Sequence, residues 1–398
     1  MTMSQCTELC HTTTSCWVHS NQLQQHTKIK MKTLVCVSDY ETEAYRILPQ
    51  NALDYYRSGA MEEITLRENK EAFNRWYIRP RLLRDVSCRN LATTILGHKV
   101  SVPYGIAPTA MQRMAHPDGE IANARAAGKI GTAFTLSTIA TTSIEEIAEK
   151  APDTLRFFQL YIYKDRKITT NLVRRAETAG FSALVLTVDA PQFGLRRADI
   201  RNKFTLPPHL KMANFETDDD KSNLVNTSAG GSGINEYVKS LFDPSLTWDD
   251  VTWLKRITNL PIVLKGILTA EDAVLGLKVG AAGIWVSNHG ARQVDGVSPT
   301  IEVLPDIVKA VNGQCEVYID GGFSQGTEIF KALALGAQMV FLGRPLLWGL
   351  ACGGEEGAYK VLDILHSELD SVMSLSGCST VKDITGDMLI RKEYYARL

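Results

Sequence analysis

Pro261-Ile262-Val263-Leu264-Lys265 and Gly283-Ile284-Trp285-Val286-Ser287 are two short apolar runs, each ending in a polar residue. Continuous apolar runs, in place of alternating apolar and polar residues, indicate strands that are covered on both faces. The segment between them closes on Gly280, and glycine readily takes the left-handed conformation that ends a helix. The order strand, helix, strand is typical of a parallel sheet.

The same pattern recurs along the chain from residue 104 onward. Glycines at 128, 180 and 336 are predicted to close further helices, each just before the next apolar run. Eight βα units in sequence predict an α/β fold, the (β/α)8 TIM barrel. An open doubly wound sheet is the alternative, and the absence of a Gly-x-Gly-x-x-Gly fingerprint after the first strand disfavours it. The six other predicted strands span residues 104–107, 132–136, 156–160, 183–188, 316–320 and 339–342.

Three segments depart from this repeat. Residues 38–59 have helical spacing of apolar residues, with Ser38 as the expected cap, and predict an N-terminal helical segment. About seventy residues separate the fourth and fifth strands, and their acidic, then Ser/Gly-rich middle predicts a long loop, either a lid or disordered. Residues 1–34 are rich in Thr, Gln, Ser and His, which predicts a disordered or non-native extension before a single domain at 35–398.

Composition excludes some classes of partner. With 43 Lys+Arg against 44 Asp+Glu, the net charge is −1, so we expect neither a nucleic acid nor an anionic membrane as partner. The sequence has no apolar stretch long enough to span a bilayer. No cluster of metal ligands appears at the predicted strand ends, and we therefore expect no metal.

Polar residues gather where the predicted strands end. In a TIM barrel these carboxyl ends of the strands form the active-site face, and a dry core requires no such set for stability. The sequence therefore predicts a catalytic site built from several strands. The residues are Ser137, Gln159, Tyr161, Thr187, Asp189, Lys265, Ser287, His289, Arg292, Asp320 and Arg344.

Among them, His289 is the candidate base, because imidazole titrates near neutrality. Asp189 ends the fourth strand and is expected to stabilise the imidazolium. Arg292 offers a fork of donors for a carboxylate. Lys265 is interpreted as a cation that stabilises negative charge on a cofactor, with a salt-bridge role as the alternative.

Glycine turns follow the seventh and eighth strands, at Asp320-Gly321-Gly322 and Leu342-Gly343-Arg344-Pro345. These loops form the usual phosphate site of the fold, since glycines let backbone N–H groups approach an anion. A phosphate-bearing cofactor, a cation, a base and a carboxylate binder together favour redox chemistry on a small acid over hydrolysis.

These motifs, with Ser287-Asn288-His289-Gly290-Ala291-Arg292-Gln293, closely resemble the FMN-dependent 2-hydroxy-acid oxidases, such as glycolate oxidase and the peroxisomal hydroxyacid oxidases. The resemblance runs from about Val37 to the C-terminus. It implies the oxidation of an (S)-2-hydroxy acid to a 2-oxo acid by FMN and O2, with release of hydrogen peroxide. It also implies a homotetramer.

The resemblance gives a role to each matching residue. His289, assisted by Asp189, takes the hydroxyl proton while the α-hydrogen leaves for the flavin, either as hydride or through a carbanion. Substrate contacts are implied for Tyr55, Tyr161, Arg196 and Arg292, with Tyr161 also catalytic. Flavin contacts are implied for Ala107, Pro108, Thr109, Ala110, Ser137, Gln159, Thr187, Lys265 and Ser287, and ribityl and phosphate contacts for Asp320, Gly321, Gly322, Gly343 and Arg344.

Two positions depart from the family pattern. Ile139 stands where glycolate oxidases carry tryptophan, and the smaller apolar residue predicts a substrate longer or bulkier than glycolate. Ser324 stands where the family usually has arginine. Because a charge-assisted hydrogen bond contributes roughly 1.5–3 kcal/mol, we expect weaker FMN retention.

The last residues, Ala396-Arg397-Leu398, are a variant of the peroxisomal Ser-Lys-Leu address and predict a peroxisomal location through the import receptor. Two other functions are weighed. One is a dehydrogenase that passes electrons to an acceptor other than O2. The other is a catalytically weakened barrel with a binding role, which the intact His289, Asp189 and Lys265 disfavour.

Overall fold

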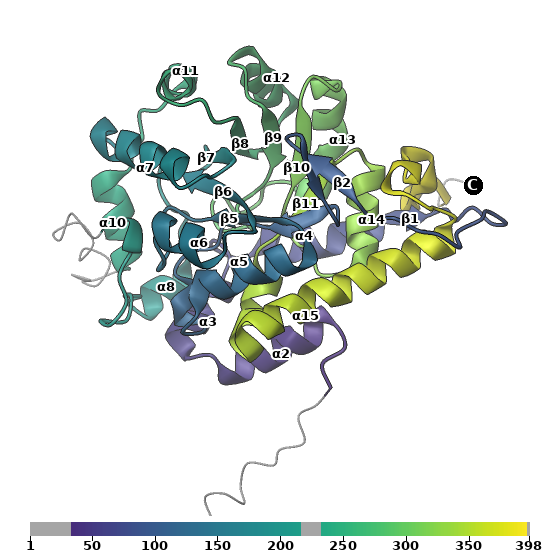
Figure 1. Cartoon of the computed structure of the whole chain (residues 1–398), viewed down its shortest axis with the longest axis horizontal. Helices are drawn as coiled ribbons and strands as arrows, with labels where there is room; N and C mark the ends of the chain where they lie inside the picture. Colours follow the sequence, from purple (N-terminus) through teal and green to yellow (C-terminus); the bar gives the residue numbers. More distant parts are fainter. Residues whose placement is uncertain (1–32, 216–231, 396–398) are drawn as a thin grey trace, which may run out of the picture. The chain divides into compact units, whose positions relative to one another are not determined.

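The computed structural model describes residues 33–215 and 232–395. Its central feature is a closed barrel of parallel strands in the order β10-β11-β4-β5-β6-β7-β8-β9, which confirms the predicted TIM barrel (Figure 1). Each predicted strand lies within two residues of an observed one. The barrel strands are β4 (Tyr104–Ile106), β5 (Ala133–Leu136), β6 (Leu155–Leu160), β7 (Ala183–Thr187), β8 (Ile262–Ile267), β9 (Gly283–Val286), β10 (Glu316–Ile319) and β11 (Met339–Leu342).

Helices surround the barrel, as continuous burial of both faces of its strands requires. The strand residues are almost all buried. After the strands come α5 (Gly119–Ile130), α6 (Ile144–Lys150), α7 (Arg166–Thr178), α8 (Arg197–Arg201), α10 (Gly233–Leu241), α11 (Trp248–Ile257), α12 (Ala270–Lys278), α13 (Thr300–Val311), α14 (Gly326–Ala334) and α15 (Arg344–Ser376). Short 3-10 turns are η1 (Ala72–Arg75), η2 (Gln112–Met114), η3 (Ala213–Phe215), η5 (Val381–Asp383) and η6 (Gly386–Met388).

A hairpin of β2 (Thr93–Ile95) and β3 (His98–Val100) closes the amino-terminal end of the barrel. Ile95 and Val100 belong to the same buried cluster as the inward-facing strand residues, including Trp285 and Phe341. The backbone N–H of Leu96, in the hairpin turn, donates to the Glu316 carboxylate at the start of β10 (3.1 Å). The opposite, carboxyl-terminal end of the barrel is therefore the end available to a ligand.

The N-terminal helical segment is confirmed as α2 (Val37–Ile47), α3 (Gln50–Arg57) and α4 (Ile64–Glu71). The prediction that Ser38 caps the first helix is wrong. Cys36 is the N-cap residue. Val37 is buried, so starting the helix two residues earlier brings an apolar side chain into contact with the core.

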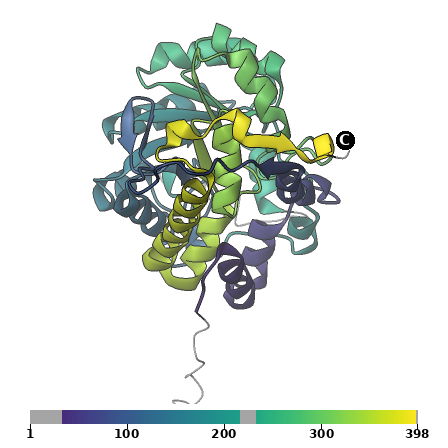
Figure 2. The ribbon, with the colours of Figure 1, turned by 90° about the vertical axis from the view of Figure 1, so that its right-hand side faces the viewer.

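The long helix α15 crosses the molecule beside α2 and α5 (Figure 1). Its two halves meet at Gly353 and Gly354, whose backbone angles are not helical. Beyond α15, β12 (Leu389–Arg391) pairs antiparallel with β1 (Trp76–Ile78), and α16 (Lys392–Tyr395) ends the described chain. Figure 2 shows this C-terminal segment lying against the dark-blue early part of the chain.

Three of the four predicted helix-closing glycines take left-handed backbone angles, at Gly180 (φ +73°), Gly280 (φ +76°) and Gly336 (φ +99°). The prediction for Gly128 is wrong, because α5 continues past it to Ile130 and Gly131 (φ +80°) is the C-cap. Gly128 serves packing instead. A Cβ there would lie 2.6 Å from Oγ1 of Thr154.

The segment between β7 and β8 has helical structure on both sides of the predicted loop, most of whose acidic and Ser/Gly-rich middle lies outside the described residues. It contains α8, η3, α10 and α11, while residues 216–231 lie outside the description. Aromatic packing stabilises this helical structure, since Tyr237 contacts both Phe215 and Phe242 with ring centroids 6.0 and 6.4 Å apart. The predicted N-terminal extension lies almost wholly outside the described residues. In the described ranges, none of the helices has the length and apolar character needed to cross a membrane.

Candidate active site

A cavity of about 370 Å³ opens at the carboxyl ends of the barrel strands. Such a volume lies within the range of small-molecule sites. Every predicted site residue lines it except Asp189 and Ser287, and each of these two contacts a residue that does. The barrel has therefore brought together residues that are far apart in the sequence, as strand-end positions predicted.

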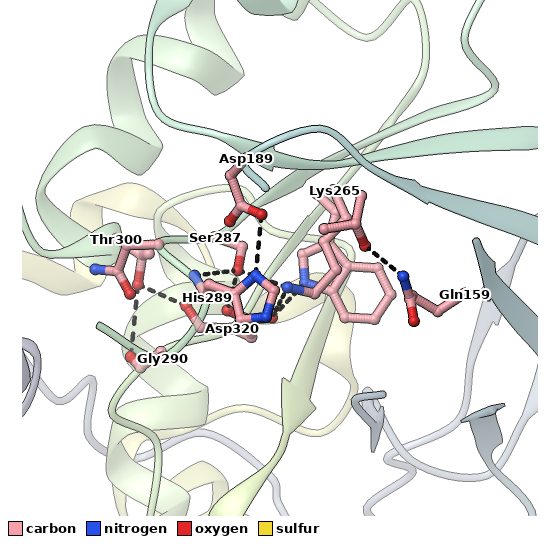
Figure 3. A network of polar contacts seen from close by, with 12 residues as sticks. Gln159, Asp189, Lys265, Ser287, His289, Gly290, Thr300 and Asp320 are labelled. Carbon is pink, nitrogen blue, oxygen red and sulfur yellow. Dashed lines mark hydrogen bonds and ion pairs between the residues drawn. The ribbon is translucent and has the colours of Figure 1, made fainter. Parts of the chain in front are cut away.

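His289 lines this cavity, and the Asp189 carboxylate lies against its ring. Nδ1 of His289 lies 2.9 Å from Oδ1 of Asp189, and Figure 3 shows the carboxylate facing the imidazole ring. This contact leaves Nε2 as the ring nitrogen able to meet a substrate. His289 has φ +57°, and such left-handed backbone in a non-glycine residue tends to cluster at functional sites.

The surroundings keep the imidazole neutral at physiological pH. Burial lowers the pKa of His289 below its ordinary value, and the positive charges of Lys265 and Arg196 act in the same direction, while Asp189 partly opposes them. Burial by itself raises the pKa of Asp189, but its contact with His289 and then the charge of Lys265 bring that pKa below the usual carboxyl value. A neutral imidazole beside a carboxylate is the arrangement that a proton acceptor needs.

The loop that carries Asp189 is held by Gln293. Nε2 of Gln293 donates to the backbone carbonyl of Asp189 (2.7 Å), and Oε1 accepts from the N–H of Gly194 (3.0 Å). Gln293 was quoted in the motif but given no role. Gln293 follows β9, whereas Asp189 and Gly194 follow β7. The sequence does not show that these two loops lie close enough for a hydrogen bond.

Lys265 lines the cavity and is held by Ser287 and Asp320. Its Nζ donates to Oγ of Ser287 (2.8 Å) and lies 3.2 Å from Oδ2 of Asp320. Ser287 in turn donates to Oδ1 of Asp320 (2.6 Å), and Trp285 Nε1 donates to Oδ2 (3.0 Å). Ser287 and Asp320 thus orient the ammonium of Lys265, whose side chain is only 5% exposed.

A polar wall continues from Lys265 along the neighbouring strands, since Thr187 at the end of β7 is the register partner of Lys265. Gln159 donates to Oγ1 of Thr187 (3.0 Å), and its Oε1 accepts from the backbone N–H of Thr138 (3.1 Å). Ser137 Oγ lies 3.4 Å from the same oxygen. These three strands, β5 to β7, present alternating donors and acceptors along one edge of the cavity.

Two glycine turns, after β10 and β11, line another part of the cavity. Gly321 (φ +103°) and Gly322 (φ +89°) follow β10, and a Cβ on Gly322 would lie 2.3 Å from the carbonyl oxygen of Asn69. Gly343 is the N-cap of α15, so a helix N-terminus with its partial positive charge faces this end. Arg344 donates to the carbonyls of Tyr56 (2.8 Å), Gly290 (3.0 Å) and Ser58 (3.0 Å).

Two arginines and two tyrosines surround the region near His289. The guanidinium of Arg292 lies 4.9 Å from the ring centre of Tyr55 and donates to the Tyr55 carbonyl (2.6 Å). Arg196 is 1% exposed, and its burial, followed by the charge of Arg292, lowers its pKa to about 10. Tyr161 is buried, and that burial raises its pKa. The tyrosine hydroxyl therefore stays protonated and the arginines positive, which suits an anionic ligand.

Sequence reasoning missed several lining residues. Phe193, on the loop after β7, lies with its ring centre 6.4 Å from those of both His289 and Tyr161. Arg67 and Lys70 reach the cavity from α4, a helix to which no site residue was assigned. Position relative to a strand end could have indicated Phe193, whereas no sequence signal marks α4.

The chain belongs to the FMN-dependent dehydrogenase family, whose sequence profile matches residues 44–391. It is 53% identical to "2-Hydroxyacid oxidase 1" of Mus musculus over 90% of this chain and 97% of that protein. It is 54% identical to "Glycolate oxidase 1" of Zea mays over 90% of this chain and 96% of that protein. A solved structure of mandelate oxidase with (S)-4-hydroxymandelic acid matches with a TM-score of 0.86 and 41% identity, covering 90% and 99% of the two chains.

The described residues fit FMN, the cofactor of this family. The polar wall around Gln159 can pair with the edge of a flavin ring, and Lys265 places a positive charge beside it. Gly321 and Gly322 line the cavity without side chains, so the backbone of this turn can approach a phosphate. The N-terminus of α15 adds a favourable dipole at the same end.

Proposed function

We propose that this protein oxidises an (S)-2-hydroxy acid to the 2-oxo acid at the cavity above the barrel. The observation that carries the proposal is the 2.9 Å His289–Asp189 pair in a cavity that Arg196 and Arg292 also line. Bound FMN supplies the acceptor for the two electrons removed, which pass to O2 to give hydrogen peroxide. Mandelate oxidase and the relatives named hydroxyacid and glycolate oxidase support this class of substrate.

In this proposal Arg196 and Arg292 bind the substrate carboxylate, and Tyr55 and Tyr161 contact its carboxylate or hydroxyl. Nε2 of His289 accepts the hydroxyl proton as the α C–H bond breaks and the carbonyl forms. Asp189 holds the ring through Nδ1 and stabilises the imidazolium. Its Oδ2 has no hydrogen-bond partner among the described residues, so no second side-chain hydrogen bond there competes with the bond to the ring.

Anaerobic mixing with a panel of 2-hydroxy acids tests this function, because substrate oxidation bleaches the bound flavin. We expect His289→Ala to retain flavin and to slow bleaching by about 10²–10⁴-fold, the usual contribution of a general base. Unchanged bleaching in this variant would refute the assigned base. Oxygen consumption without an added acceptor separates an oxidase from a dehydrogenase.

For the substrate itself, we propose an acid bulkier than glycolate. Ile139 is 3% exposed and lines the cavity, and Phe193 adds a second apolar surface beside His289. Neither side chain can donate a hydrogen bond, so together they favour an apolar substituent on the α-carbon.

We also propose a tetrameric assembly and a peroxisomal location. The tetramer follows from the family resemblance, and size-exclusion chromatography with light scattering tests it. The location follows from residues 396–398, which lie outside the described residues, together with the production of peroxide. A reporter fused to the last twelve residues that stays cytosolic would contradict it.

We further propose that residues 1–34 lie outside the functional domain, because the family profile matches from residue 44 and α2 begins at Val37. Removal of residues 1–30 is then expected to leave flavin bleaching unchanged. A large loss of bleaching rate would place part of that segment in the domain.

A further inference from the structure

The phosphate end of the cavity has few free cations. Of the arginines that line the cavity, Arg196 and Arg292 lie near His289, at the end proposed for the substrate, and Arg57 is paired with Asp54 (2.6 Å). Arg344 lies at the glycine-turn end, but three backbone carbonyls already accept from its guanidinium, and burial, followed by the charge of Arg292, lowers its pKa to about 10. A phosphate that carries close to two negative charges is thus left with limited compensation from Arg344.

The turn after Gly322 adds no positive charge. Ser324 follows Phe323 there, and its backbone N–H and hydroxyl both approach the Glu328 carboxylate. Glu328 is buried, and this burial raises its pKa to about 7. The segment that follows the glycine turn therefore offers a phosphate no cationic side chain at position 324.

Helix α4 meets this same turn from the other side. The carbonyl oxygen of Asn69 would lie 2.3 Å from a Cβ on Gly322, which means that the backbones of α4 and the glycine turn touch. The Asn69 side chain exchanges two hydrogen bonds with Asn288 (3.0 and 2.8 Å), which fix the end of the helix. Lys70 is the next residue and lines the cavity.

Lys70 is held only loosely by its neighbours. Its Nζ lies 3.4 Å from Oε2 of Glu41, and its side chain is 55% exposed. Charge-assisted hydrogen bonds normally measure about 2.7–2.9 Å, so this contact leaves the ammonium free to turn toward a stronger anion. Arg67 also lines the cavity, but its Nη1 donates to the carbonyl of Glu62, just before the same helix (3.0 Å).

We propose that Lys70 is a cofactor-binding residue that supplies the positive charge for the FMN phosphate in place of an arginine at position 324. The ammonium leaves Glu41 and pairs with the phosphate held between the glycine turn and the N-terminus of α15. This offsets part of the weaker FMN retention expected from Ser324. The inference rests on the proposed flavin site and concerns only the phosphate of its cofactor.

Binding of FMN and of riboflavin to the apoprotein tests the inference without turnover, because riboflavin lacks the phosphate. Quenching of flavin fluorescence gives both dissociation constants. We expect Lys70→Met to weaken FMN binding about tenfold, as for the loss of one charge-assisted contact, and to leave riboflavin binding unchanged. Lys70→Arg is expected to restore most of the FMN affinity.

The matched control is Arg67→Met, which removes the same charge from the same helix and cavity. It is expected to change FMN affinity less than twofold. Glu41→Gln, which frees Lys70, is expected to tighten FMN binding. In a Ser324→Arg background, Lys70→Met is expected to cost much less than tenfold, because the two cations serve one phosphate.

Three results would overturn the inference. Equal loss of FMN and riboflavin binding in Lys70→Met indicates a structural role, and an unchanged FMN constant indicates no role. An equal loss of FMN affinity in Arg67→Met indicates that the general positive potential of α4, and not a specific contact of Lys70, attracts the phosphate. If the wild-type apoprotein binds neither flavin, the proposed function itself is wrong, which distinguishes the two failures.

Discussion

The carboxylate of Asp189 packs directly against the backbone of Gly266. A Cβ at Gly266 would lie 2.7 Å from Cγ of Asp189. Gly266 has φ +111° and sits where the register between β8 and β9 shifts, and such bulges re-aim neighbouring side chains. The bulge therefore turns Lys265 toward Ser287 and, at the same time, makes room for the acid that supports His289.

Gly266→Ala is expected to displace Asp189 and to slow flavin bleaching at least tenfold while flavin remains bound. The matched control is Gly180→Ala, which also places alanine at a positive φ (+73°) but meets only Nη2 of Arg156, at 3.8 Å. Both variants should lose stability, since alanine is disfavoured at positive φ. Only the first should lose bleaching rate, as measured by stopped-flow absorbance. Equal losses would mean that strain, and not the position of Asp189, matters.

The pH dependence of bleaching follows from the lowered pKa of His289. The base must be neutral, so the rate falls as pH drops through this pKa, which lies below the ordinary histidine value. Asp189 raises the pKa of His289, and Asp189→Asn should therefore move the acidic limb to lower pH. The maximal rate should also fall, by about 10²-fold or more, because the imidazolium loses its stabilising charge. A limb that moves to higher pH contradicts the pairing.

Ile139→Trp tests the proposed preference for bulky acids. The larger indole is expected to fill part of the apolar region beside His289 and to lower the ratio of kcat/KM for a long-chain or aromatic 2-hydroxy acid to that for glycolate. Because one methylene changes specificity by about 10–200-fold, a drop of at least tenfold is expected. The control is Ile139→Leu, which keeps volume and should leave the ratio nearly unchanged. A higher ratio in the tryptophan variant would count against the assigned role.

Glu328 predicts a pH-dependent stability. Burial raises its pKa to about 7 from 4.5, so between these values the folded protein holds a proton that the unfolded chain has released. Stability from this group is thus present at low pH and declines as pH rises through the folded pKa. Relative to Glu328→Gln, the melting temperature of the FMN-saturated wild type should fall between about pH 5 and pH 8. Parallel melting curves across that range would show that Glu328 does not titrate there.

Strand positions could be predicted from sequence because buried parallel strands are continuous apolar runs, and the run containing Trp285 is typical. Helix ends were less predictable. Gly128 and Gly131 are both glycines near the end of α5, and only packing against Thr154 decides which one stays helical.

The residues of the candidate site that stand at strand ends could also be predicted from sequence, whereas those on α4 could not. His289, Lys265 and the glycine turns stand at strand ends, where the fold places its chemistry. Lys70 could not be found this way, because its position depends on the contact between Asn69 and Gly322. The bond that aligns Gln293 with the Asp189 loop likewise exists only once the strands have closed.

The pairing of β1 with β12 has a consequence for the order of assembly. Trp76 aligns with Arg391, so a strand near the beginning of the described chain can pair only after a strand near its end has been made. Closing so long a loop carries a large entropic cost before any contact rewards it, and contacts of this kind slow folding. During synthesis from the N-terminus, β1 stays without its partner until residues 389–391 have left the ribosome. This two-stranded sheet, which lies outside the barrel, is therefore completed by the last part of the described chain to be made.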